Sequence, residues 1–149
     1  MPKFSEQSLN KLNNVNGDLV KILMKAIEEY DFTVIYGYRT PEEQYELFKQ
    51  GRENDNGEWR IVNSSQVVTP YDGINHKSNH NFMPSRAVDI APYPIDWEHN
   101  LNRFQDLSII IKRIAKDLNI NIKWGGDFKK RDEKGNLIPS PDMPHYELI

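Results

Sequence analysis

The 149-residue sequence contains no cysteine. The chain therefore has no disulfide, no thiol nucleophile and no thiolate ligand for zinc, so any metal ion must be held by histidine, aspartate or glutamate. Histidine is also scarce, and the four present are His76, His80, His99 and His145. With so few nitrogen ligands available, the position of each histidine carries information about a metal site.

The sequence also lacks long apolar runs and blocks of like charge. No stretch approaches the roughly 20 apolar residues that a membrane-spanning helix needs, and residues 1–14 have no apolar stretch typical of a signal peptide. We therefore expect synthesis in the cytoplasm and no membrane insertion. The formal net charge of −3 argues against nucleic acid as a partner.

Helical patterning is present in three places. Apolar residues recur at helical spacing over residues 17–30 and 100–119, which predicts two amphipathic helices. Between them, Thr40 and Glu43 have the spacing of a capping box, and Gly51 is a plausible end for the helix that follows.

Strands are predicted where β-branched and aromatic residues cluster. These runs cover residues 32–38, 85–93, 120–124 and 145–149, and residues 60–69 look extended. Residues 125–142 form a polar excursion with a turn at residues 134–136. Strands and helices do not alternate regularly, and we find no linker, so we expect a single α+β domain over residues 1–149.

The segment "SNHNFMPSRAVDIAPYP" places His80 nine residues before Asp89, which lies on a predicted strand. Hydrolytic zinc commonly takes three protein ligands and leaves a fourth position for water. A zinc ion bound by His80, Asp89 and His145 would form such a site. His76 is a reserve ligand, and we otherwise expect His76 and His99 at the surface.

Two charged residues could complete a catalytic site. Asp142 precedes His145 by three residues, so one short turn can bring a ligand and a general base into the same small volume. Arg39 follows a predicted strand and precedes a predicted helix, a junction that often faces a cleft. It could stabilise an oxyanion or hold a substrate carboxylate, with a structural salt bridge as the alternative.

Three further residues are candidates for supporting roles. Gln44 lies five residues after Arg39 and could contact substrate or simply be exposed. Trp124, before two glycines, could line a cleft or fill the core. Glu147 shares a strand face with His145 and could support that ligand from behind.

In combination, these segments resemble the zinc D-alanyl-D-alanine carboxypeptidase family, which cuts peptidoglycan stem peptides. The pair "SNH" and "AVD" is similar to the family's Ser-x-His and Ala-x-Asp motifs, and "DMPHYEL" is similar to its last motif. Its upstream segment with arginine and glutamine resembles "YGYRTPEEQYELFKQG", its N-terminal opening "FSEQSLNKLNNVNGDLV", and the turn before the last ligand "WGGDF". The resemblance covers nearly the whole chain.

The resemblance implies a small α+β fold of the hedgehog/DD-peptidase type, in which an antiparallel sheet carries a Zn²⁺ ion. The implied residues are the zinc ligands His80, Asp89 and His145, the catalytic base Asp142, and Arg39 and Ser78 on the substrate side. Two features depart from the family's usual pattern. The loop between His80 and Asp89 is longer, and residues 129–141 form an insertion beside the expected cleft.

The base distinguishes branches of this family. The vancomycin-resistance dipeptidases and carboxypeptidases typically use glutamate, whereas Asp142 is similar to phage endolysins that cut the L-alanyl-D-glutamate bond. We therefore predict a zinc-dependent peptidoglycan endopeptidase with Gln44, Ser78 and Trp124 as substrate contacts. We expect a monomer that reaches the wall through a separate pore-forming protein. The alternatives are a D,D- or L,D-carboxypeptidase, or a catalytically silent zinc- or peptide-binding module.

Overall fold

A computed structural model of the chain describes residues 2–149. Its helices are α1 (Glu6–Leu12), α2 (Gly17–Ala26), α3 (Pro41–Lys49) and α4 (Asn102–Asp117), with short 3-10 turns η1 (Ser64–Gln66), η2 (Asn79–Asn81) and η3 (Gly125–Asp127). Its strands are β1 (Phe32–Tyr36), β2 (Arg52–Asp55), β3 (Glu58–Ile61), β4 (Ala87–Pro92), β5 (Ile122–Trp124), β6 (Lys129–Arg131), β7 (Leu137–Pro139) and β8 (His145–Leu148).

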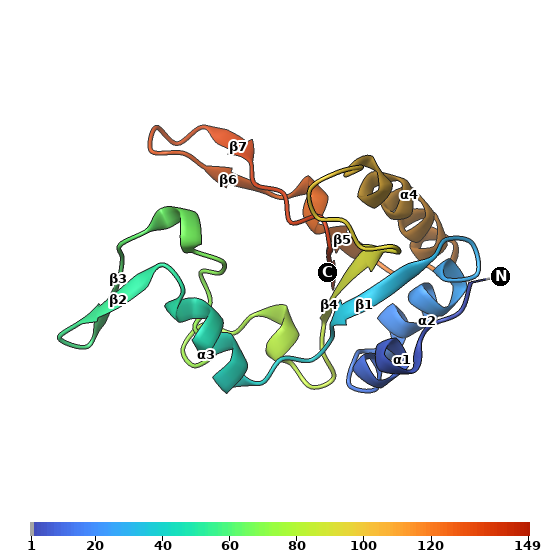
Figure 1. Cartoon of the computed structure of the whole chain (residues 1–149), viewed down its shortest axis with the longest axis horizontal. Coiled ribbons are helices and arrows are strands. Elements are labelled where there is room, and N and C mark those ends of the chain that lie inside the picture. The colour runs from blue at the N-terminus through green and yellow to red at the C-terminus, as the bar shows by residue number, and fades with distance from the viewer. Residues whose placement is uncertain (1) are drawn as a thin grey trace.

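The main sheet has four strands in the order β1-β4-β8-β5, and every neighbouring pair is antiparallel. Strands β2 and β3 form one separate hairpin, and β6 and β7 form another. In Figure 1 both hairpins project to the left of the main sheet, whereas α1, α2 and α4 lie to its right. The predicted α+β class with an antiparallel sheet is therefore confirmed.

Side-chain alternation divides the two faces of this sheet. Val88, Ile90, Tyr146 and Leu148 are buried in one core together with apolar residues of α2 and α4. Because successive side chains of a strand point to opposite faces, the residues between them, including Asp89 and Glu147, point away from this core. The polar face of the sheet is thus free to carry chemistry.

Local signals account for the helix starts. The Thr40 hydroxyl accepts from the Glu43 amide at 3.1 Å, and the Glu43 carboxylate accepts from the Thr40 amide at 3.2 Å, so the predicted capping box is present. Helix α1 was not predicted. It begins after Ser5, whose hydroxyl accepts from the amide of Ser8. Within residues 2–149, no helix combines the length and the apolar character needed to cross a membrane.

Two predicted segments differ from the structure. Helix α2 ends at Ala26, and residues 27–29 continue as turns rather than as helix. The extended reading of residues 60–69 is confirmed for Arg60 and Ile61 in β3 and was wrong for Ser64–Gln66, which form η1. The Asn63 side chain accepts from the Ser65 amide at 3.2 Å, which stabilises a turn where the apolar pattern suggested a strand. The insertion at residues 129–141 contains the β6–β7 hairpin, whose turn includes Gly135 at a φ of 82°.

Candidate metal centre and active site

The polar face of the sheet brings the three predicted ligands together. Nε2 of His80 lies 3.4 Å from Oδ1 of Asp89, and Nδ1 of His145 lies 3.2 Å from the same oxygen. One potential ligand atom from each residue falls within 4.8 Å of the other two. Among the described residues this is the group able to hold a metal ion, whereas His76 and His99 are both 75% exposed and lie outside it. Two imidazole nitrogens and a carboxylate oxygen are donors that suit zinc.

Backbone pairing places two of these ligands. Asp89 on β4 lies directly opposite His145 on β8 in the strand register. His80 comes from η2, where its carbonyl oxygen accepts from the Arg39 amide at 2.9 Å. The long loop after His80 therefore returns Asp89 to the site along a rigid strand.

Hydrogen bonds determine which nitrogen each histidine offers. Nδ1 of His80 lies 2.8 Å from the carbonyl oxygen of Gly37, and since a carbonyl only accepts, Nδ1 carries the hydrogen and Nε2 is left as the donor atom for a metal. For His145 the arrangement is reversed, because Nε2 donates to Glu147 at 2.7 Å and leaves Nδ1 toward Asp89. Asn79 in turn donates to the other carboxylate oxygen of Glu147 at 2.8 Å.

The electrostatics of the group favour a cation. Burial alone would lower the pKa of His145, but its hydrogen bonds to Asp89 and Glu147 outweigh this effect and raise the pKa to about 9. Burial likewise opposes ionisation of Asp89, yet the hydrogen bonds from His145 and His80 hold the pKa of this carboxyl well below its usual range. Asp89 and Glu147 thus favour positive charge at the ligand atoms, which a bound metal ion would supply in place of a proton.

Asp142 lies at the edge of the centre. Its Oδ2 is 3.9 Å from Nδ1 of His145, and its side chain is 54% exposed. The two residues belong to one tight turn, in which the His145 amide donates to the Asp142 carbonyl and the Asp142 amide donates to Gly125. Partial burial and the nearby Asp89 carboxylate raise the pKa of Asp142, which suits a group that must accept a proton and release it again.

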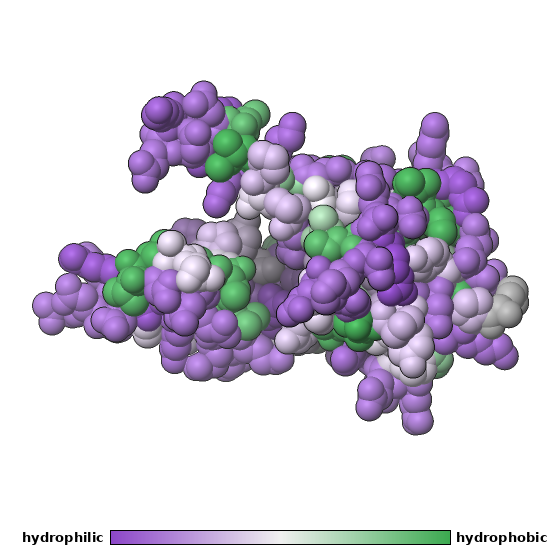
Figure 2. All heavy atoms as spheres, turned by 45° about the horizontal axis from the view of Figure 1, so that its top comes forward, coloured by the Kyte–Doolittle hydropathy of each residue, from purple (hydrophilic) through white to green (hydrophobic). Residues whose placement is uncertain are grey.

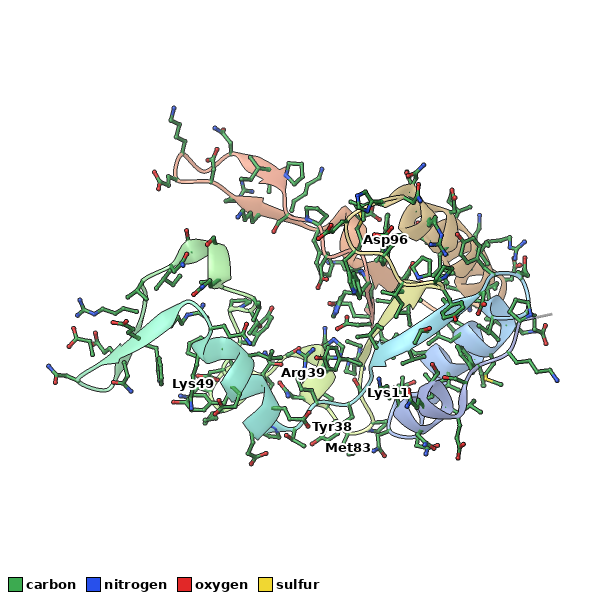
Figure 3. All side chains as sticks on the ribbon, in the orientation of Figure 1. Lys11, Tyr38, Arg39, Lys49, Met83 and Asp96 are labelled. Atoms are coloured by element: carbon green, nitrogen blue, oxygen red, sulfur yellow. The ribbon has the colours of Figure 1, made fainter. Side chains whose placement is uncertain are left out.

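Arg39 lies where the chain passes from β1 to α3, as Figure 3 shows. One guanidinium nitrogen, Nη2, is 3.6 Å from Oδ2 of Asp89, so Arg39 forms a salt bridge beside the candidate metal centre. Its contact with an oxyanion or with a substrate carboxylate stays a prediction. Its Nη1 donates to the Gln44 side chain at 2.8 Å, and its Nε is buried without a hydrogen-bond partner among residues 2–149.

The three predicted substrate contacts are all buried. Gln44 donates to Thr69 and to the carbonyl of Tyr71, so it holds Arg39 from behind rather than facing solvent. Ser78 caps η2 by accepting from the His80 amide at 3.2 Å. Trp124 is 7% exposed, and its indole N–H donates to the Met143 carbonyl at 2.7 Å. Contact of these residues with substrate stays a prediction, whereas their positioning contacts are evident.

Sequence reasoning missed two asparagines. Asn81 donates to the Arg39 carbonyl at 2.8 Å, and Asn79 bonds Glu147, 68 residues away in the chain. For Asn81 a signal existed, because its side chain also accepts from the Ser78 amide, three residues earlier, in a capping-box spacing. For Asn79 no local pattern could have indicated so distant a partner.

The space-filling view shows where a substrate could approach. Figure 2 shows a hollow between the part of the molecule that carries α3 and the β2–β3 hairpin and the part that carries the main sheet. A two-histidine, one-carboxylate centre with a neighbouring acid is the arrangement of hydrolytic metal enzymes.

Comparison with known proteins shows to which family the chain belongs. A model of the phage L-alanyl-D-glutamate peptidase family matches residues 1–149, and the chain therefore belongs to this family. It is 27% identical over 154 residues to the L-alanyl-D-glutamate peptidase of Escherichia phage T5, covering 99% of this chain and 98% of the relative. It is 28% identical over 149 residues to the peptidoglycan L-alanyl-D-glutamate endopeptidase CwlK of Bacillus subtilis, covering 95% of this chain and 74% of CwlK.

The fold has a solved counterpart. The crystal structure of the Serratia marcescens L-Ala D-Glu endopeptidase ChiX superposes with a TM-score of 0.66 at 22% identity, covering 98% of this chain and 89% of ChiX. The family match and the curated relatives confirm the resemblance inferred from the sequence motifs, and the protein is a peptidase.

Proposed function

We propose that this protein is a zinc-dependent endopeptidase that hydrolyses the L-alanyl-D-glutamate bond of peptidoglycan stem peptides. The observation that carries the proposal is the convergence of His80, Asp89 and His145 within 4.8 Å, in a chain whose relatives are named for that bond. The donor set and its electrostatics support zinc as the metal.

Each residue has a role in this proposal. His80, Asp89 and His145 hold the zinc ion, which when bound supplies a Lewis acid that polarises the scissile carbonyl and lowers the pKa of a water molecule. Asp142 takes the proton of the attacking water and passes it to the leaving amine, a task that its raised pKa supports. Arg39 places its positive charge beside Asp89, where it can stabilise negative charge on the carbonyl oxygen or hold a substrate carboxylate.

Substituting the base separates catalysis from metal binding. Asp142→Asn should slow peptide release by roughly 10²- to 10⁴-fold, because proton transfer is lost while the three ligands stay intact. Zinc content measured by atomic absorption should equal that of the wild type. The control is Asp106→Asn on α4, an exposed residue distant in sequence from the site. Wild-type turnover by Asp142→Asn would show that another group is the base.

Removing a ligand tests the metal site itself. His80→Ala should lower the zinc content, and His99→Ala should not, because His99 is exposed and outside the ligand group. An unchanged zinc stoichiometry in His80→Ala would remove His80 from the site.

Analysis of the released products shows which bond of the stem peptide the protein cleaves. Purified peptidoglycan is digested with and without a chelator, and the released peptides are identified by mass spectrometry. Chelator-sensitive release of peptides beginning at D-glutamate supports the endopeptidase. Loss of a terminal residue would assign the protein to the carboxypeptidases, and no products from a zinc-loaded protein would make it a silent binding module. The expected monomer and passage through a pore-forming protein stay predictions, the first testable by analytical ultracentrifugation.

A further inference from the structure

A second concave surface lies beside the active site, along the outer edge of the sheet. This groove, of about 620 Å³, is bordered by α4, β5 and the β6–β7 hairpin. Its apolar surface includes Ile122, Trp124, Phe128 and Leu137. We call it the lysine groove, because four lysines line it: Lys112, Lys116, Lys123 and Lys129.

The lysine groove carries positive charge, opposite in sign to the net charge of the chain. The one acidic side chain among its lining residues is Asp127, which pairs with Lys112 at 2.7 Å. Within residues 2–149, Lys116, Lys123 and Lys129 form no ion pair of their own. Lys123 does lie opposite Glu147 in the strand register and helps to lower the pKa of that carboxyl. Lys116 and Lys129 add two further cations to the groove, in a protein whose formal net charge is −3, and this distribution attracts an anionic ligand.

Two aromatic residues connect the lysine groove with the active site. Phe128 is a lining residue of the groove, and its ring lies 5.5 Å, centroid to centroid, from the ring of His145. Trp124 also lines it, and its indole donates to the carbonyl of Met143, the residue after Asp142. The lysine groove and the candidate metal centre are therefore neighbours, with Phe128 in contact with His145 and among the lining residues of the groove.

The shape suits an extended ligand. Strand β5 is the last strand of the main sheet and pairs, as far as residues 2–149 show, only with β8. A sheet edge of this kind leaves backbone groups available to an extended chain that lies beside it. Lysine ammonium groups on flexible stems can then adapt to carboxylates at several positions along such a chain.

We propose that the lysine groove binds the carboxylates of a second peptidoglycan stem peptide, next to the one being cut. The proposal rests on the proposed function, since peptidoglycan supplies the ligand. Stem peptides carry a free carboxylate at a glutamate linked through its side chain and another at their end, and many such peptides project from one glycan strand. Binding a neighbouring peptide would keep the enzyme on the polymer between cleavages.

The test measures binding apart from cleavage. Cosedimentation uses insoluble peptidoglycan stripped of covalently attached phosphate polymers, and protein carrying Asp142→Asn so that the polymer persists. The variant Lys116→Glu/Lys129→Glu reverses two charges of the groove. The matched control, Lys21→Glu/Lys25→Glu, makes the same charge change at two exposed residues of α2 that do not line the groove. A second probe is the same peptidoglycan with its carboxylates converted to amides.

At low ionic strength, the groove variant should bind peptidoglycan about tenfold more weakly than the control, because attraction at two sites becomes repulsion. On amidated peptidoglycan the difference should vanish. In the background that retains Asp142, the groove variant should cut a single soluble stem peptide at the rate of the wild type, which also shows that it folds.

Three results would overturn the proposal: equal binding by groove variant and control, an equal loss on amidated polymer, or binding that disappears when phosphate polymers are stripped. Failure of the proposed function is a separate result. In that case the wild type would release no peptides from peptidoglycan, whatever the binding experiment shows.

Discussion

Gly125 lets the turn from Asp142 to His145 pack closely against it because it has no side chain. A Cβ added at this position would lie 2.1 Å from the carbonyl oxygen of Asp142 and 2.9 Å from Cβ of His145. Real Cβ atoms essentially never approach other heavy atoms more closely than 3.0 Å. The obstructing atom is backbone, so Gly125→Ala must displace the turn that carries both the proposed base and a proposed metal ligand.

The size of the effect follows from this overlap. Restoring a separation of 3.0 Å from 2.1 Å requires the turn to move by about 0.9 Å. Misplacing catalytic groups by about 1 Å can cost about 10²-fold in rate, and overpacking of this kind costs about 1–3 kcal/mol of unfolding free energy. For a chain of this length that corresponds to a Tm lower by roughly 3–10 °C.

Calorimetry and a peptide-release assay measure the two effects on one preparation. Gly17→Ala is the matched control, because a Cβ at Gly17 meets no atom within 4 Å and the residue lies at the start of α2. Gly125→Ala should lose both Tm and activity relative to this control. If the two variants were equal in Tm and in rate, the tight approach of Gly125 to Asp142 would not be required, and the reasoning would fail.

Three further outcomes are expected around the metal centre. Glu147→Ala should weaken zinc affinity roughly 10- to 100-fold, because His145 loses the acceptor that orients its ring, and Glu147→Gln should restore much of that affinity. Competition with a chromogenic chelator measures the affinity. If both variants bound zinc as tightly as the wild type, Glu147 would not orient His145. The metal-free protein should lose thermal stability as pH rises from 6.5 to 9. The pKa of His145 is raised to about 9 from an ordinary value of 6.5, so the stabilisation from its protonated ring is complete below pH 6.5 and is lost as pH passes 9. Asp89 has the opposite sign, since its lowered pKa gives a contribution that is present above 3.8 and lost in acid; a Tm independent of pH over both ranges would refute the two assignments. Gln44→Leu should lower the unfolding free energy by about 1–3 kcal/mol and reduce activity, because it leaves Nη1 of Arg39 buried without an acceptor. A variant as stable and active as the wild type would show that Gln44 does not position Arg39.

Predictions based on neighbouring residues were the most accurate. The capping box of Thr40 and Glu43 joins residues three apart, so it forms without any contact from distant segments and the local sequence is enough to predict it. The shared face of His145 and Glu147 follows from strand alternation over two residues. The reading of residues 60–69 held only for Arg60 and Ile61, which pair with β2. Beyond them the Asn63 side chain stabilises a turn, and apolar content alone could not indicate this.

The sequence by itself determined the chemistry available to the site. Without cysteine and with four histidines, the set of possible ligands was small, and the motifs around His80, Asp89 and His145 indicated the family. These conclusions depend on which residues are present and on short spacings, both of which are properties of the chain alone.

Only the tertiary structure decided how those residues are used. It assigned the metal-facing nitrogen of each histidine, because the acceptors Gly37 and Glu147 reach the rings through strand pairing and loop packing. It showed that Gln44, for which an exposed position was one expectation, is fully buried and hydrogen-bonded to Arg39. It also assembled the lysine groove from α4, β5 and the β6–β7 hairpin. These features arise from contacts between segments far apart in the chain, and their geometry exists only once burial of the shared core has brought those segments together.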